Sequence, residues 1–299
     1  MIEEIKVIEM KRTSALFGSG GNPKSFYDEG YNDTSRVFKW LREKNIDSYE
    51  YQAGNGLSAG AAVLKKIGEA AAENDILLSL HAPYFISISS DDDEIIAKSV
   101  SHVIRCVNAA SAMGAYMIVI HSGSLGKNTR DKALEKSRST IGKILSILYR
   151  DSKTSIKIGL ETMGKQNQLG TLDEVISLCK ADKILYPVID FGHLNCRGEN
   201  PSERFKTPGD YLRVFEKIGA GLNEEKAKYL HCHFSKIEYT QKGEKKHLTF
   251  EDKIFGPEFD PLAEVLANNK LYPNIICESD STMDIDALYM KNTYKNIKI

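Results

Sequence analysis

The sequence lacks long hydrophobic runs. Its longest aliphatic stretches, such as Met-Ile-Val-Ile at 117–120, are far shorter than the roughly 18 residues that a membrane span requires. The opening residues, Met-Ile-Glu-Glu-Ile-Lys, contain neither the basic nor the apolar region of a secretory signal. We therefore expect no membrane span and no signal peptide.

Cysteine is scarce and follows no paired pattern. Five cysteines are an odd number, and no two of them form a C-x-x-C pair. This argues against a zinc ribbon, a thioredoxin-type redox site and a secreted disulfide scaffold. A reduced, cytoplasmic setting is the expectation.

An excess of charge of one sign is also missing. Lys plus Arg number 40 and Asp plus Glu number 41, so the formal net charge is −1. No whole-molecule attraction to nucleic acid or to an anionic membrane follows, although composition does not reveal local basic patches. With 41% hydrophobic and 27% charged residues and no linker-like segment, the composition is that of an ordinary folded protein. We expect one domain over residues 1–299.

Short aliphatic runs alternate with longer segments of helical spacing along the chain. The runs predict strands at 13–17, 46–51, 76–80, 116–120, 156–160, 186–189, 228–230 and 274–277. The segments between and after them predict helices at 34–44, 59–74, 90–113, 129–149, 172–180, 209–218, 261–269 and 285–296. Such alternation implies parallel strands, and eight units in about 300 residues fit a single (β/α)8 TIM barrel. A doubly wound sheet is the alternative that periodicity does not exclude.

Histidines and carboxylates directly follow six successive runs. They lie about one βα unit apart, so a closed barrel brings them together at its C-terminal mouth, where barrel enzymes place their sites. These residues are His81, His121, Glu161, Asp190, His231 and Glu278.

One such residue alone is more often an ordinary polar residue than a ligand, but six in register favour a metal. Buried charges that converge must be paired or neutralised. Mixed nitrogen and oxygen donors suit zinc, manganese or iron(II), and one tetrahedral zinc needs only four of them. Metal binding is therefore favoured, and a multinuclear centre becomes plausible.

Further histidines lie within reach of this mouth. His193 follows Asp190 at a D-x-x-H spacing, and His247 lies in the loop after the seventh run. His233 shares a strand face with His231. His102 lies inside a predicted helix and has no predicted function.

The ordered set of histidines and carboxylates resembles the endonuclease IV family, the metal-dependent abasic-site endonucleases. The matching motifs are Leu-His-Ala-Pro-Tyr at 80–84, His-Ser-Gly-Ser at 121–124, Gly-Leu-Glu-Thr at 159–162, Asp-Phe-Gly-His at 190–193 and His231-x-x-x-Ser235-Lys236. The resemblance covers nearly the whole chain.

This resemblance implies a cluster of two or three Zn²⁺ ions on a TIM barrel, with Mn²⁺ as an alternative. The implied ligands are His81 and His121 for one metal, Asp190, His231 and Glu278 for a second, Glu161 as the bridge between them, and His193 and His247 for a third. Glu161 and Glu278 would be the catalytic carboxylates.

The resemblance also implies action on damaged double-stranded DNA by a monomer, with cleavage 5′ to an abasic site. Tyr84 falls where the family places an aromatic residue that enters the DNA. Lys236, Lys245 and Lys246 are predicted DNA contacts, although a solvated basic loop is an equal interpretation of their sequence.

The chain departs from the family at three places. Lys245 stands where the family has an Asp ligand of the third metal, for which Glu244 or His233 are candidate substitutes if the centre is not dinuclear. The family's Asn-Asp pair is replaced by His233-Phe234, and residues 51–56 lack the family's DNA-probing arginine.

Two other classes of function stay open. A xylose-isomerase-like sugar isomerase or epimerase would use one Mn²⁺ or Mg²⁺ held by Glu161, Asp190, His231 and Glu278, whereas His81, His121 and His193 argue for more than one metal. A non-catalytic barrel that binds DNA or a partner is the third interpretation.

Overall fold

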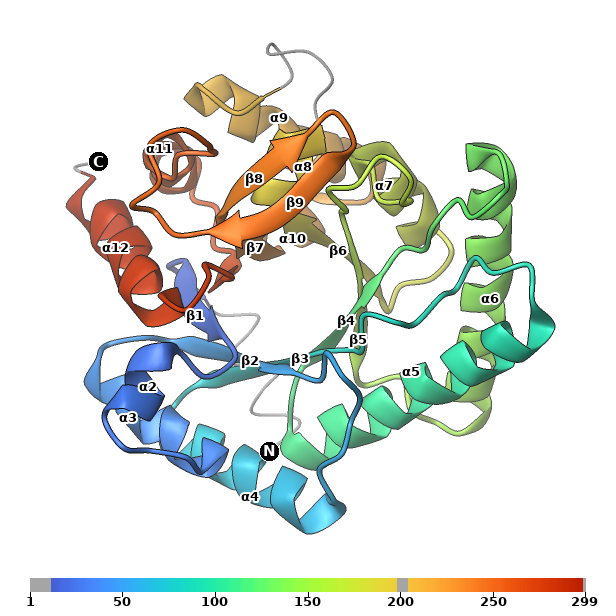
Figure 1. Cartoon of the computed structure of the whole chain (residues 1–299), viewed down its shortest axis with the longest axis horizontal. Coiled ribbons are helices and arrows are strands. Elements are labelled where there is room, and N and C mark those ends of the chain that lie inside the picture. The colour runs from blue at the N-terminus through green and yellow to red at the C-terminus, as the bar shows by residue number, and fades with distance from the viewer. Residues whose placement is uncertain (1–11, 198–203, 298–299) are drawn as a thin grey trace.

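Eight parallel strands close into a barrel in the residues that the structure describes, 12–197 and 204–297. The structure is a computed structural model. The strands are β1 (Leu16–Gly20), β2 (Ser48–Gln52), β3 (Leu77–His81), β4 (Met117–His121), β5 (Lys157–Glu161), β6 (Leu185–Asp190), β7 (His231–Phe234) and β10 (Asn274–Cys277). Each pairs in parallel with its neighbours, and β1 closes the ring against β10 (Figure 1). The predicted (β/α)8 TIM barrel is confirmed, and the doubly wound sheet is excluded.

Helices surround the barrel and cover the outer faces of the strands (Figure 1). They are α2 (Lys24–Asp28), the 3₁₀ helix η1 (Thr34–Arg36), α3 (Val37–Glu43), α4 (Ala61–Glu73), α5 (Asp93–Met113), α6 (Arg130–Arg150), α7 (Leu172–Cys179), α8 (Phe191–Arg197), α9 (Pro208–Gly221), α10 (Glu224–Lys228), α11 (Asp260–Asn268) and α12 (Met283–Asn296).

Local sequence explains where several helices begin. The Asp92 side chain caps α5 by accepting hydrogen bonds from the backbone amides of Glu94 and Ile95. Thr171 and Glu174 form a reciprocal capping box at the start of α7. These caps hold the loops that follow β3 and β5 at one end of the barrel.

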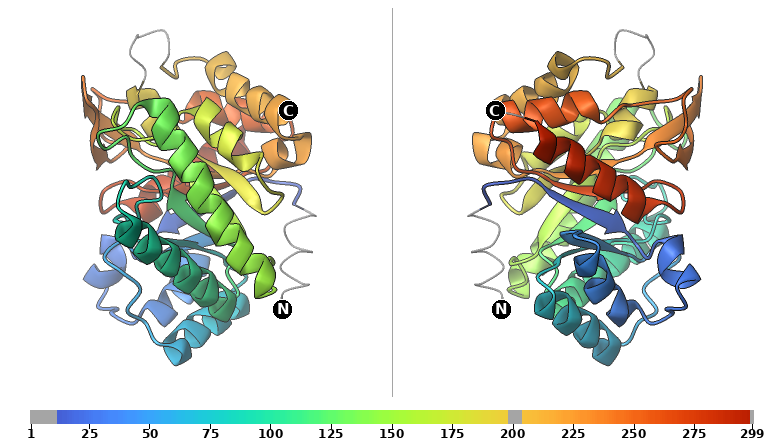
Figure 2. Two further views of the ribbon diagram at one scale, coloured as in Figure 1. Left: turned by 90° about the vertical axis from the view of Figure 1, so that its right-hand side faces the viewer. Right: turned by 90° about the vertical axis from the view of Figure 1, so that its left-hand side faces the viewer.

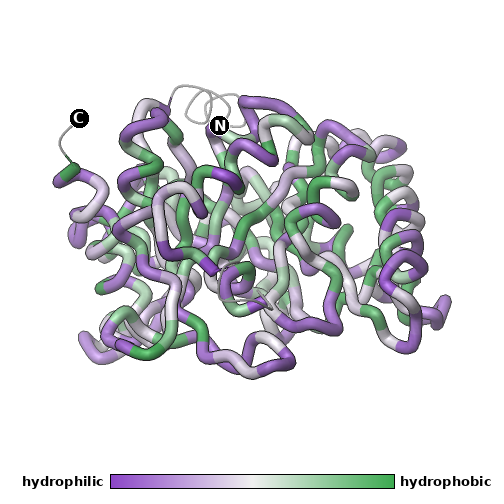
Figure 3. The backbone as a smooth tube through the Cα atoms, turned by 90° about the horizontal axis from the view of Figure 1, so that it is seen from above, coloured by the Kyte–Doolittle hydropathy of each residue, from purple (hydrophilic) through white to green (hydrophobic). Residues whose placement is uncertain are grey.

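Apolar side chains fill the space between the strands and the helices. One buried cluster joins α3 to α7 with β2 to β6, and a second joins α9, α11 and α12 with β1, β7 and β10. Hydrophobic and hydrophilic stretches alternate along the chain (Figure 3). Among the described residues, no helix is both long enough and apolar enough to cross a membrane.

An antiparallel hairpin lies over one end of the barrel. It consists of β8 (Lys236–Thr240) and β9 (Gly243–Leu248), and the side views show it at that end (Figure 2). The sequence predicted only a loop here, because Lys- and Glu-rich strands carry no strong strand signal.

Two barrel strands begin three residues later in the chain than predicted: β1 begins at Leu16 instead of 13, and β7 begins at His231 instead of 228. The sequence placed a strand at 228–230, but α10 ends at Lys228 and β7 runs over His231–Phe234. The prediction was wrong because pairing decides the register: His231 lies opposite Val188 of β6 and Asn274 of β10. His231 is therefore the first residue of β7, whereas the sequence had placed it directly after the end of that strand.

Candidate metal centre

The carboxyl ends of four adjacent strands carry the first group of side chains. His81, His121, Glu161 and Asp190 are the last residues of β3, β4, β5 and β6. His121 and Glu161 are register partners, and every second residue of a strand shares a face. The four side chains therefore lie at one rim of the barrel, as the sequence predicted.

Glu161 lies at the centre of the histidines. Its Oε2 atom is 3.2 Å from His81 Nε2 and 3.5 Å from His121 Nε2. Its Oε1 atom is 3.1 Å from His233 Nδ1 and 3.4 Å from His193 Nδ1. One oxygen of the Glu161 carboxylate thus faces each pair of imidazoles, and Glu161 belongs to two of the groups that could hold an ion.

Backbone carbonyls fix the orientation of two imidazoles. His81 Nδ1 is 2.8 Å from the carbonyl oxygen of Ala82, and His193 Nδ1 is 2.9 Å from that of Thr162. A carbonyl only accepts, so Nδ1 carries the proton and Nε2 is the free donor for a metal when the ring is neutral.

Unpartnered buried atoms support the fit of a cation here. Asp190 Oδ2 and His193 Nε2 are buried and lack a hydrogen-bond partner. Leaving such atoms without a partner is costly, and a cation coordinated by both oxygen and nitrogen would remove that cost. The donor set therefore fits a metal.

Four groups of side chains bring their donor atoms close enough to hold an ion. All donor atoms within a group lie within 4.8 Å of one another. The groups are His81, His121 and Glu161; Glu161, Asp190, His233 and Glu278; Glu50, His81, His233 and Glu278; and His193, Glu244 and His247.

His231 is the one predicted ligand that the structure leaves outside these groups. It lies one layer deeper in the barrel, where Tyr116 contacts its Nδ1 atom and Glu50 its Nε2 atom. His233, two residues further along β7 and opposite Asp190, takes the predicted place at the rim. The difference follows from the shifted start of β7.

Glu244, which the sequence suggested as a substitute for the missing aspartate, lies beside His193. Its Oε2 atom is 3.4 Å from His193 Nε2, and both belong to one group with His247. Two glycines allow this approach, because a Cβ atom on Gly164 would lie 2.7 Å from Glu244 Cβ and one on Gly243 would lie 2.1 Å from a backbone oxygen. Of the two substitutes that the sequence suggested, Glu244 occupies this position.

Charges within the cluster shift its pKa values in opposite directions. Burial lowers the pKa of His81 and His193, but the neighbouring carboxylates outweigh it and raise the pKa to about 9 and about 10. Burial lowers the pKa of His121 to about 4. Burial also raises the pKa of Glu161, but His233 and the other imidazoles outweigh it and hold this pKa well below its usual range. The Glu161 carboxylate therefore stays ionised, and its negative charge is one that a bound divalent cation would neutralise.

Glu278 differs from Glu161 in its electrostatics. Burial raises the Glu278 pKa above its ordinary value. Its Oε2 atom is 3.5 Å from His233 Nδ1, and it belongs to two of the four groups. The two carboxylates predicted to be catalytic therefore lie in one site.

Glu50 is the residue that the sequence did not reveal. It lies inside β2, is fully buried, and belongs to one of the four groups. A single carboxylate between two tyrosines within a predicted strand was the available signal, because a half-buried strand face rarely places an acid among aromatics.

The predicted DNA contacts lie in different surroundings. Tyr84 is 62% exposed in the loop after β3. Lys245 and Lys246 are exposed on the hairpin and pair with Glu238. Lys236 is buried, and its ammonium group is 2.7 Å from both Glu258 and the carbonyl oxygen of Asp252. Lys236 is therefore engaged within the protein and is not a free cation for DNA.

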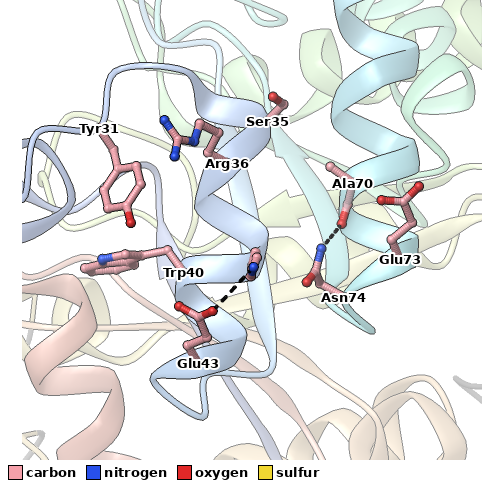
Figure 4. Close-up of a pocket in the computed structure, with 9 residues that line it drawn as sticks. Tyr31, Ser35, Arg36, Trp40, Glu43, Ala70, Glu73 and Asn74 are labelled. Atoms are coloured by element: carbon pink, nitrogen blue, oxygen red, sulfur yellow. Dashed lines mark hydrogen bonds and ion pairs between the residues drawn. The ribbon is translucent and has the colours of Figure 1, made fainter.

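A surface pocket lies apart from this cluster. It has a volume of about 310 Å³ and lies between α3 and α4, where Figure 4 shows Tyr31, Arg36, Trp40 and Asn74 at its wall. It shares no residue with the four groups.

Comparison with known proteins identifies the family. Residues 38–289 match the family described as xylose isomerase-like TIM barrel, and the chain belongs to this family. A protein of Methanocaldococcus jannaschii described as uncharacterized is 27% identical over 282 residues, which cover 94% of this chain and 97% of that protein. A probable endonuclease 4 of Mycoplasma genitalium is 28% identical over 277 residues, which cover 90% of this chain and 81% of that protein.

Two solved structures show the same fold. Endonuclease IV from Thermus thermophilus aligns with a TM-score of 0.67 at 14% identity, over 95% of this chain and 100% of that one. A D-tagatose 3-epimerase-like protein aligns with a TM-score of 0.65 at 21% identity, over 86% of this chain and 90% of that one. Proteins named for two different chemistries thus share this fold.

Proposed function

We propose that this protein is a zinc-dependent phosphodiesterase that cleaves double-stranded DNA 5′ to an abasic site. The observation that carries the proposal is the number of imidazoles at the rim. A one-metal epimerase would be complete with Glu161, Asp190, His233 and Glu278, yet the same mouth holds three further groups, which add the imidazoles of His81, His121, His193 and His247. The relative named probable endonuclease 4 supports the same assignment.

The proposed centre has three positions. The first is held by His81, His121 and Glu161, the second by Glu161, Asp190, His233 and Glu278, and the third by His193, Glu244 and His247. Zinc suits these sets because it accepts three or four nitrogen and oxygen ligands, and Mn²⁺ is the alternative.

The residues of the chain would organise the reaction around the scissile phosphate. When bound, the metals would activate a water molecule and neutralise the charge that develops on the phosphate oxygens. Glu161 would hold two positions at a fixed separation, and Glu278 would line the same site. The carbonyl oxygens of Ala82 and Thr162 would keep His81 and His193 oriented.

The surface around the mouth offers DNA contacts of two kinds. Exposed Tyr84 is placed to stack against a base or an abasic sugar, as aromatic residues do in enzymes that take a nucleotide out of the helix. Lys245 and Lys246 lie on the hairpin as candidate phosphate contacts. We infer that the protein acts as a monomer, which light scattering of the protein with and without DNA tests.

A ketose 3-epimerase is the second candidate. The group Glu161, Asp190, His233 and Glu278 is sufficient for one divalent metal, and the D-tagatose 3-epimerase-like structure shares the fold. In that case carboxylates beside the metal would move a proton next to the sugar carbonyl.

Metal analysis combined with two activity assays separates these functions. We expect two or three zinc ions per chain, incision of an abasic duplex, and no conversion of D-tagatose. His121→Ala should abolish incision, whereas His102→Ala is the matched control because that imidazole lies on α5 outside the four groups. One metal per chain, with sugar epimerisation and no incision, would establish the epimerase instead.

A further inference from the structure

A buried carboxylate lies one layer below the metal centre. Glu50 is fully buried in β2, and its register partner is Ser79 of β3. Gln52 is paired with His81, so Glu50 lies two residues deeper in the barrel than the ligand at the rim. The proposed metal positions do not require Glu50, and its environment indicates a separate role.

One oxygen of Glu50 is held by the barrel interior. Oε2 is 3.0 Å from His231 Nε2 and accepts a hydrogen bond of 2.8 Å from the Ser79 hydroxyl. On the other side of the His231 ring, Nδ1 faces the Tyr116 hydroxyl at 2.5 Å and the Asn274 amide nitrogen at 3.4 Å. An amide nitrogen only donates, so Nδ1 is the acceptor and Nε2 carries the proton that points at Glu50.

The other oxygen of Glu50 faces a proposed ligand. Oε1 is 3.0 Å from His233 Nε2, a buried atom that makes no hydrogen bond in good geometry, and Glu50 is the carboxylate that lies beside it. The opposite nitrogen of that ring, Nδ1, is 3.1 Å from Glu161 Oε1 and 3.5 Å from Glu278 Oε2. The His233 ring therefore has a carboxylate behind it and the donor atoms of the metal centre in front of it.

We propose that Glu50 is the positioning residue of His233: it accepts the Nε2 proton, so that Nδ1 binds the metal. This inference rests on the proposed metal centre. A carboxylate behind a histidine ligand fixes the tautomer and ring orientation and makes the ligand more basic. His231 and Ser79 in turn hold Glu50, because both donate to the oxygen that does not face His233.

The arrangement favours this role over direct coordination by Glu50. Oε2 already accepts from two donors, and Oε1 faces the Nε2 atom of an imidazole whose other nitrogen is directed at the rim.

Metal affinity of Glu50→Gln tests the inference. The glutamine keeps the shape but turns one oxygen into a donor that faces His231, His233 or Ser79. Zinc is titrated into metal-stripped protein in competition with a chromophoric chelator. We expect one zinc equivalent to bind about 10 to 100 times more weakly than in the wild type, with the other equivalents unchanged.

Glu174→Gln is the matched control. Glu174 is also a buried carboxylate, but it pairs with Arg130 at the start of α7 and belongs to none of the four groups. We expect a change in thermal stability for this variant and no change in zinc affinity. If Glu50 had a purely structural role, Glu50→Gln would likewise change thermal stability and leave zinc affinity unchanged. That result would overturn the inference.

A second measurement uses the wild-type protein and does not depend on whether a variant folds. In ¹⁵N-histidine NMR of the zinc form, His233 should be protonated at Nε2 and coordinated through Nδ1. Coordination through Nε2, or a Co²⁺ spectrum that changes coordination number in Glu50→Gln, would overturn the inference and make Glu50 a direct ligand. If the wild type binds metal but does not cut abasic DNA, the proposed function fails while this inference stands. If it binds no metal, both fail.

Discussion

The two sides of the candidate metal centre are built differently. The strand side consists of His81, His121 and Glu161, each the last residue of a barrel strand that pairs with neighbours on both sides. The hairpin side consists of His193, Glu244 and His247. Its Glu244 and His247 lie on β9, which pairs only with β8 among the described strands, and both are partly exposed.

This difference indicates how each side tolerates change in sequence. A ligand at the end of a barrel strand is held by two ladders of hydrogen bonds, so its position is set by the fold. A ligand on a hairpin depends on local turns and on contacts such as the 2.8 Å hydrogen bond between His247 Nδ1 and Ser235. We therefore propose that the hairpin side can exchange one carboxylate position for its neighbour, with Glu244 in place of a carboxylate at position 245.

The largest effect is expected for the residue that joins the two sides. Glu161→Gln removes a fully buried charge that faces four imidazoles. We expect the loss of at least one metal and a drop in abasic-DNA incision of more than about 100-fold, because changes behind a ligand already cost about 10- to 100-fold. Metal analysis and an incision assay measure both. Incision at the wild-type rate would remove Glu161 from the mechanism.

A smaller and more selective effect is expected on the hairpin side. Glu244→Gln should lower the metal content by about one equivalent and leave the strand side loaded, because Glu244 contacts only the hairpin group. During timed chelation of the wild type, one equivalent should leave before the others. Simultaneous loss of all metals in either experiment would show that the two sides are one cooperative unit.

Proton release gives a third comparison of the sides. In the metal-free protein His81 and His193 have a raised pKa of about 9 and about 10, so both are protonated at pH 7, whereas His121, at about 4, is neutral. Metal binding should therefore release protons from His81 and His193, and zinc affinity should rise from pH 7 toward about pH 9 to 10. Calorimetry in buffers of different ionisation enthalpy counts these protons.

The same raised pKa values affect the stability of the metal-free fold. Their contribution is fully present below the ordinary histidine value of 6.5 and is lost as the pH rises through about 9 to 10. Thermal unfolding of stripped protein should thus occur at lower temperature at about pH 10 than at pH 6.5. A zinc affinity that is independent of pH would contradict both expectations.

The smallest effect is expected at the exposed lysines of the hairpin. Lys245→Ala and Lys246→Ala should leave stability nearly unchanged, because the pairs with Glu238 are exposed and solvent screens them. If these residues contact phosphates, each variant should reduce the salt dependence of DNA binding by about one charge. A salt dependence equal to that of the wild type would exclude them from the DNA interface.

Much of the barrel and part of the centre could be predicted from the sequence. The runs that became β3, β4 and β5 are aliphatic and end in a histidine or a carboxylate, so the strand and its ligand were visible together. For β7 the residues Lys-Tyr-Leu at 228–230 precede a strand with the sequence His-Cys-His-Phe, and a pattern based on hydrophobic runs misplaced it. Because of this misplacement the sequence pointed to His231, whereas the structure brings His233 to the rim opposite Asp190.

The sequence by itself determined the alternation of strands and helices and which residues end β3 to β6, because period and composition are local properties of the chain. The tertiary structure decided which histidine of β7 reaches the rim, that Glu244 meets His193, and that Glu50 lies behind His233. These contacts depend on barrel closure, strand register and the fold of a hairpin, and each of those is set by pairing between segments far apart in the chain.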